Sequence, residues 1–205
     1  MRLLASLTVL GWGLVALPHA RAAVIETMMQ VGSDVVVTAS GTIDLAGFNN
    51  PGYEQYSSGA NGIIPDLGSI IVGAPGTATT DLYGPFTGPT SFGTGGFTQP
   101  SSGSGDRVGV RQDSPSTTFI VVPQAYVSGA ALSGSSTFSN ATYASLGVDI
   151  GTYVWSWGSG PTVDSLTLDV VDPASTVAEP GALGWLAVAL AGLFVARRSR
   201  TRSAI

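Results

Sequence analysis

The chain has 205 residues, with no cysteine, no lysine, one histidine and a formal net charge of −5. Residues 23–178 carry two arginines against twelve acidic residues, a net charge of −10, and such an acidic surface disfavours nucleic-acid binding because it repels phosphate backbones. The one histidine is His19, so Ser-His-Asp, Cys-His and His- or Cys-based zinc chemistry are excluded for residues 23–178.

The first 22 residues have the layout of a secretory signal peptide. Arg2 precedes a 15-residue apolar run, a proline ends that run, and small residues occupy both specificity positions of a leader-peptidase site, Ala20 and Ala22. The run is shorter than the roughly 17–25 residues that a membrane-spanning helix needs. We therefore expect export, with cleavage by signal peptidase after Ala22.

Alternation of apolar and polar residues predicts β-strands across a single domain at residues 23–171. Over 35–45 the odd-numbered residues form an apolar face and the even-numbered residues a polar one. Short strands at this spacing, with no helical period before Glu179, predict a mostly-β fold, namely a β-sandwich with a jelly roll as one candidate topology. Further strands are expected at 117–122, 131–138, 152–157 and 165–171.

Residues 84–105 are almost all Gly, Ser, Thr and Pro, with Phe86, Phe92 and Phe97 spaced along them. We expect a long surface loop that these phenylalanines pin to the sheet, with a binding loop as the alternative. Residues 172–178 are expected to form a short linker.

Tyr153, Trp155 and Trp157 share one side of the strand at 152–157. Such a stripe is typical of a core strand, and its functional alternative is a sugar-stacking platform that faces solvent. The two interpretations differ in whether this face is buried.

No catalytic residues and no cofactor are predicted. The chain has no Gly-x-Ser-x-Gly elbow, P-loop or Rossmann fingerprint, and most of its carboxylates are expected beside turns or on polar strand faces. Asp106 and Asp113 are weak candidates for calcium ligands, and a local turn explains Asp106 equally well. We therefore predict that the protein is not an enzyme.

The C-terminal segment, residues 179–205, has the layout of a membrane anchor. Residues 181–196 carry no charge, and at about 1.5 Å per residue a helix there is nearly long enough to cross a bilayer. A basic tail at 197–205 follows, and it should stay cytoplasmic and leave the domain outside. Its arginines are Arg197, Arg198, Arg200 and Arg202.

Glu179 and Pro180, followed by this apolar run and basic tail, resemble the PEP-CTERM sorting signal of Gram-negative bacteria, which exosortases recognise. The family motif is Pro-Glu-Pro, and this chain has Ala178 at the first position. The domain also resembles uncharacterised PEP-CTERM proteins. The segments that carry this likeness are 34–42 (DVVVTASGT), 103–109 (GSGDRVG) and 145–168 (SLGVDIGTYVWSWGSGPTVDSLTL).

This resemblance implies an exported protein that is first anchored in the inner membrane as a precursor. Together with the absence of catalytic motifs, it leads us to expect a non-catalytic protein of the cell surface or extracellular matrix. The implied partners are the export machinery, signal peptidase and an exosortase-like membrane protease. The alternative is a carbohydrate-binding, lectin-like module, with or without calcium, that acts on extracellular polysaccharide.

We predict that the mature exported protein begins at Ala23, because Ala20 and Ala22 provide the small residues that signal peptidase requires. N-terminal sequencing of the exported protein checks this. A mature form that still contains residues 3–17 would contradict it.

Overall fold

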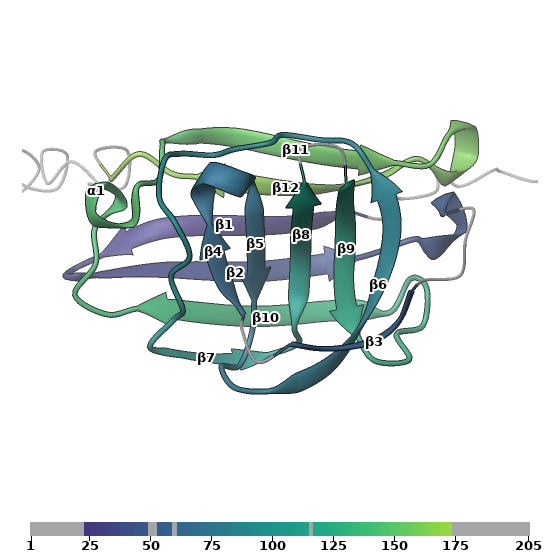
Figure 1. Ribbon diagram of the computed structural model, residues 1–205, viewed down its shortest axis with the longest axis horizontal. Coiled ribbons are helices and arrows are strands. Elements are labelled where there is room, and N and C mark those ends of the chain that lie inside the picture. The colour runs from purple at the N-terminus through teal and green to yellow at the C-terminus, as the bar shows by residue number, and fades with distance from the viewer. Residues whose placement is uncertain (1–22, 49–52, 59–60, 115–116, 174–205) are drawn as a thin grey trace, which may run out of the picture.

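The structure is a computed structural model that describes residues 23–48, 53–58, 61–114 and 117–173. These residues form two six-stranded β-sheets packed face to face (Figure 1). The strands of one sheet run crosswise to those of the other, which is the orthogonal form of sheet packing. The predicted β-sandwich is therefore confirmed.

Twelve strands, one turn of α-helix and three 3₁₀ turns make up the described elements. The helical elements are α1 (Tyr143–Leu146), η1 (Leu45–Gly47), η2 (Pro65–Leu67) and η3 (Gly160–Thr162). The strands are β1 (Val24–Val31), β2 (Asp34–Thr42), β3 (Tyr53–Ser58), β4 (Gly62–Ile64), β5 (Ser69–Val72), β6 (Ala78–Phe86), β7 (Ser102–Gly105), β8 (Val108–Ser114), β9 (Thr117–Pro123), β10 (Ala131–Phe138), β11 (Gly151–Trp157) and β12 (Asp164–Val170).

Sheet A has the strand order β11-β12-β1-β2-β10-β7. Its first and last strands in sequence, β1 and β12, are parallel neighbours, and Val24 lies opposite Leu166 while Met28 lies opposite Val170. The remaining pairs in the sheet are antiparallel. A jelly roll is built from antiparallel Greek keys, so the parallel pair departs from that candidate topology.

The parallel register gives the sandwich two distinct ends. Both β1 and β12 begin at the end where η1 follows β2, which we call the η1 end. Both strands finish at the opposite end, where the Tyr143 hydroxyl of α1 donates to the carbonyls of Met28 and Val171. This second end is called the α1 end, and Figure 1 shows α1 there.

Sheet B has the order β3-β6-β9-β8-β5-β4 and is antiparallel throughout. Its inner face and that of sheet A enclose one apolar core, which holds the domain together without disulfides. Each large side chain buried there stabilises the fold by about 1.5–3 kcal/mol. Fully buried examples from both sheets are Trp155, Leu166, Leu168, Val110, Ile120 and Val122.

The strands predicted from the sequence are confirmed as β2, β9, β10, β11 and β12, although β2 ends at Thr42 and Leu45 lies in η1. Their faces are also as expected, since Val35, Val37 and Ala39 of β2 are buried while Thr38 and Ser40 are exposed. The buried positions of these strands are mostly apolar, with polar exceptions that include Ser136 of β10 and Asp164 of β12, and β9 is buried on both faces.

The segment 84–105 is only partly the predicted loop. β6 continues to Phe86 at its start, and β7 occupies its end as an edge strand of sheet A. Phe92 is buried in the core and anchors the intervening chain, as expected. Phe97 is 53% exposed, so it does not anchor the chain to the core. Two isolated bridges, Ile63 to Thr98 and Gly93 to Val148, also tie this segment to the domain.

Within the described ranges, no helix has the length and apolar character needed to cross a membrane. The predicted signal peptide at 1–22 and the predicted helix at 181–196 lie outside those ranges.

Glu26 is an acidic residue inside the core. It faces inward from β1 between Val24 and Met28, beside Ala39 and Leu168 on the neighbouring strands, and is fully buried. Neither carboxyl oxygen has a hydrogen-bond partner among the described residues. Burial raises the pKa of Glu26 well above its ordinary value of 4.5, so the folded protein holds this carboxyl protonated at pH values where the unfolded chain ionises it.

We predict that Glu26→Gln makes the protein more stable at neutral pH. With a raised folded pKa, the contribution of Glu26 to stability is fully present below pH 4.5 and falls by about 1.4 kcal/mol per pH unit as the pH rises towards that pKa. The amide does not titrate, so this loss is absent in the variant. Denaturant unfolding of both proteins across this pH range measures the difference.

Asp169→Asn, which changes a partly exposed carboxylate on the neighbouring β12, is the matched control and should keep the parent's pH dependence. An unchanged pH dependence in Glu26→Gln would show that Glu26 is not buried as described.

Candidate functional site

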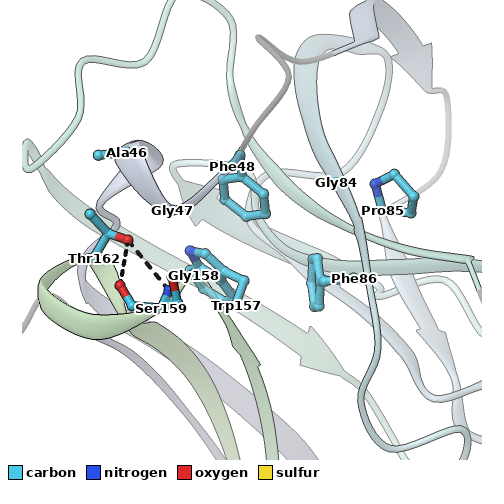
Figure 2. A pocket seen from close by; sticks show the side chains of 10 residues that line it. All are labelled: Ala46, Gly47, Phe48, Gly84, Pro85, Phe86, Trp157, Gly158, Ser159 and Thr162. Carbon is cyan, nitrogen blue, oxygen red and sulfur yellow. Dashed lines mark hydrogen bonds between the residues drawn. The ribbon is translucent and has the colours of Figure 1, made fainter.

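A pocket of about 500 Å³ opens at the η1 end of the sandwich (Figure 2). Three segments that are far apart in sequence meet there: η1 with the residue after it, the end of β6, and the turn from β11 through η3. The pocket is lined by Ala46, Gly47, Phe48, Gly84, Pro85, Phe86, Trp157, Gly158, Ser159 and Thr162.

Two aspartates fix the first wall of this pocket. Asp44 caps η1, its side chain accepting a hydrogen bond from the Ala46 N–H at 2.9 Å and another from the Ser128 hydroxyl at 3.1 Å. The Asp44 N–H in turn donates to the Asp164 carboxylate at 2.6 Å. The start of β12 therefore holds η1 in place.

Close backbone packing brings the second wall against the first. A Cβ atom on Gly47 would lie 2.8 Å from the Thr162 carbonyl oxygen and 3.0 Å from the Trp157 ring, so only glycine fits. Gly158 has φ +76°, and a Cβ there would lie 2.1 Å from the same carbonyl. These two glycines let η1 and the turn after β11 touch.

The floor of the pocket is an aromatic cluster of Phe48, Phe86 and Trp157. Phe48 stacks on Trp157 with centroids 5.3 Å apart, and Phe86 lies 5.4 Å from Trp157 in a tilted arrangement. The Trp157 indole donates to the Asp44 carbonyl at 3.3 Å, and its ring is only 5% exposed. Phe48 and Phe86 are half-buried, so their rings are accessible from the pocket.

The surroundings of the pocket are acidic. Burial raises the pKa of Asp164, hydrogen bonds from the Asp44 and Ser165 N–H groups oppose that shift, and the Asp44 charge adds to it. Both Asp164 oxygens accept backbone hydrogen bonds, which suits a structural brace better than a proton-transfer group.

The predicted aromatic stripe is divided between the core and this pocket. Trp155 is fully buried and donates to the Pro89 carbonyl at 3.2 Å, Trp157 lines the pocket floor, and Tyr153 is half-buried against Phe92. The three rings therefore do not form a solvent-facing sugar platform.

The two calcium candidates lie at opposite ends of β8. Asp106 pairs with Ser133, accepting from its N–H at 2.9 Å, and Asp113 forms an ion pair with Arg111 at 2.7 Å. At about 3.3 Å per residue, the intervening strand separates them by roughly 20 Å, so they cannot share one ion. The described residues contain no group of three His, Cys, Asp or Glu arranged to hold a metal.

The predicted sorting and processing residues lie outside the described residues. These are Ala20, Ala22, Glu179, Pro180, Arg197, Arg198 and Arg200.

Sequence reasoning missed the pocket because its parts share no local signal. Phe86 is recognisable only as a loop anchor, Phe48 follows a predicted strand without any motif, and Trp157 belongs to a core stripe. Only the packing of the three segments brings these rings together.

Comparison of the chain with protein-family models, with curated proteins and with solved structures finds no match.

We predict that Trp155→Ala lowers the free energy of unfolding by about 3–5 kcal/mol, because it removes a fully buried ring and its hydrogen bond to the Pro89 carbonyl. Denaturant unfolding measures this loss. Val154→Ala, at a half-exposed position on the opposite face of β11, should cost far less. Equal stability of Trp155→Ala and the parent would contradict the buried placement.

Proposed function

We propose that this chain is an exported, non-catalytic protein of the bacterial cell surface or extracellular matrix, delivered by a PEP-CTERM-like C-terminal sorting signal. The observation that carries the proposal is the order of elements at the C-terminus. Glu179 and Pro180 precede an uncharged 16-residue run, and four arginines follow it.

In this proposal residues 1–22 are a cleaved signal peptide and residues 181–196 cross the inner membrane. Pro180 fixes the backbone and disfavours helix at the residue before it, so the junction presents an extended segment at the outer face of the bilayer. An exosortase-like membrane protease would cut there and release the domain.

The parallel pairing of β1 and β12 supports this arrangement. Ala23 enters the domain at the η1 end, whereas β12 and Val171 leave it at the α1 end, where the Val171 N–H donates to the Met28 carbonyl at 3.0 Å. The two predicted targeting segments therefore join the domain at opposite ends. In this proposal, cleavage of the signal peptide and anchoring by residues 181–196 therefore take place at opposite ends of the domain and do not interfere with each other.

The composition of the mature region supports a non-catalytic role. Residues 23–178 contain no histidine, cysteine or lysine, so their acid-base chemistry is limited to carboxylates and tyrosines. The carboxylates of Asp44, Asp81, Asp106 and Asp164 all accept hydrogen bonds from backbone N–H groups, as residues that brace turns and strand ends do.

We predict that replacing both Glu179 and Pro180 by alanine leaves the full-length precursor in the inner membrane, because the protease loses its recognition segment. Membrane fractionation with mass spectrometry of the termini measures this. Deleting residues 181–205 should instead give a periplasmic protein that never reaches the surface.

The matched control replaces Asp172 and Pro173 by alanine, since this acid–proline pair lies upstream of the proposed signal. It should be processed like the parent. If the Glu179/Pro180 variant were also processed and delivered like the parent, residues 181–196 would be an ordinary permanent anchor.

A further inference from the structure

We propose that the pocket at the η1 end binds a neutral glycan chain. This inference names a class of ligand for the surface protein proposed above. It rests on the proposed function only in one respect, which is that a surface location would bring extracellular polysaccharide within reach of the pocket. It concerns a different surface from the stripe on β11, because two of its three aromatic residues, Phe48 and Phe86, come from other segments.

The floor of the pocket suits the apolar side of a sugar ring. A pyranose has a face of C–H groups and an edge of hydroxyls, so it requires an aromatic surface beside polar groups. Phe48 and Phe86 provide half-buried rings, and Trp157 beneath them is locked by its hydrogen bond to the Asp44 carbonyl. A rigid aromatic floor of this kind reduces the entropy lost on binding.

The rim of the pocket supplies the polar groups. Ser159 is exposed, and the Thr162 hydroxyl donates to the Ser159 carbonyl at 3.0 Å, which holds the turn in one conformation (Figure 2). Gly47 and Gly158 contribute backbone to the same rim. Glycan hydroxyls both donate and accept hydrogen bonds, so they match a rim of hydroxyls and peptide groups.

The charges around the pocket favour a neutral ligand over an acidic one. Asp164 and Asp44 lie behind its first wall, joined through the Asp44 N–H. The two arginines of residues 23–178 both belong to the β8 region, where Arg107 donates to the Ala74 carbonyl and Arg111 pairs with Asp113. A uronate or phosphate would therefore meet repulsion without a compensating cation.

The volume and location of the pocket also fit a polymer. A cavity of about 500 Å³ lies within the roughly 300–1,000 Å³ range of small-ligand sites, enough for one or two sugar units. Because the pocket lies at the η1 end, it is opposite the end from which β12 leads towards the proposed anchor. A chain-like ligand can thus enter without passing the membrane.

Isothermal titration of the purified full chain in detergent tests this proposal. The probes are maltohexaose and cellohexaose as neutral glycans and hexagalacturonate as the acidic one. We expect at least one neutral probe to bind with Kd below about 1 mM, and hexagalacturonate to bind at least about tenfold more weakly.

Phe86→Ala should weaken binding of the neutral probe at least about tenfold, because it removes part of the aromatic floor. Phe97→Ala is the matched control, since this phenylalanine is 53% exposed and does not line the pocket. It should bind like the parent. Ser159→Gln is a second variant of the same site, for use if Phe86→Ala fails to fold. Ser159 is exposed at the entrance of the pocket, so the larger side chain should narrow that entrance and weaken binding without disturbing the core.

The proposal is overturned if neither neutral probe binds at about 10 mM, if hexagalacturonate binds as tightly as the neutral probes, or if folded Phe86→Ala and Ser159→Gln both bind like the parent. These titrations need no sorting machinery. Failure of the sorting signal in cells and failure of glycan binding are therefore separate results.

Discussion

The pairing of the first strand with the last is the constraint on which the rest of this domain depends. β1 is bonded on one side to β2, which follows it directly, and on the other to β12, at the far end of the domain sequence. Because β1 lies inside sheet A, that sheet and its core are incomplete until β12 docks. Such a long-range contact delays folding until almost the whole domain is available.

The same pairing determines where the pocket lies. Since β1 and β12 run in the same direction, both begin at the η1 end, and Asp164 at the start of β12 can accept the Asp44 N–H that precedes η1. An antiparallel pairing would have placed the start of β12 at the other end. The wall of the pocket, the aromatic floor and the placement of Ala23 and Val171 at opposite ends of the domain therefore follow from one choice of strand direction.

Among the described residues, Glu26 is the one buried carboxyl without a hydrogen-bond partner, and its neighbours on β1, β2 and β12 are apolar. Glu26 lies among fully buried neighbours, and protonation avoids the larger cost of burying a charge without a partner. The same residue explains why β1 is hard to recognise, since an acidic residue at an inward position interrupts the apolar alternation of Val24 and Met28. β7 cannot be recognised in the sequence for another reason, which is that its residues, SGSG, include no apolar side chain. It forms a strand because its backbone pairs with the edge of β10.

The sequence alone determined the class of fold, because β2, β11 and β12 alternate with the two-residue period of a half-buried strand, and β9 is a short β-branched run that ends at a proline. It also determined the limits on chemistry, because residue types that are missing cannot be supplied by folding. Only the tertiary structure decided which sheet each strand joins, the parallel direction of β12, and the meeting of Phe48, Phe86 and Trp157. Those features depend on contacts between residues far apart in the chain, which leave no local pattern in the sequence.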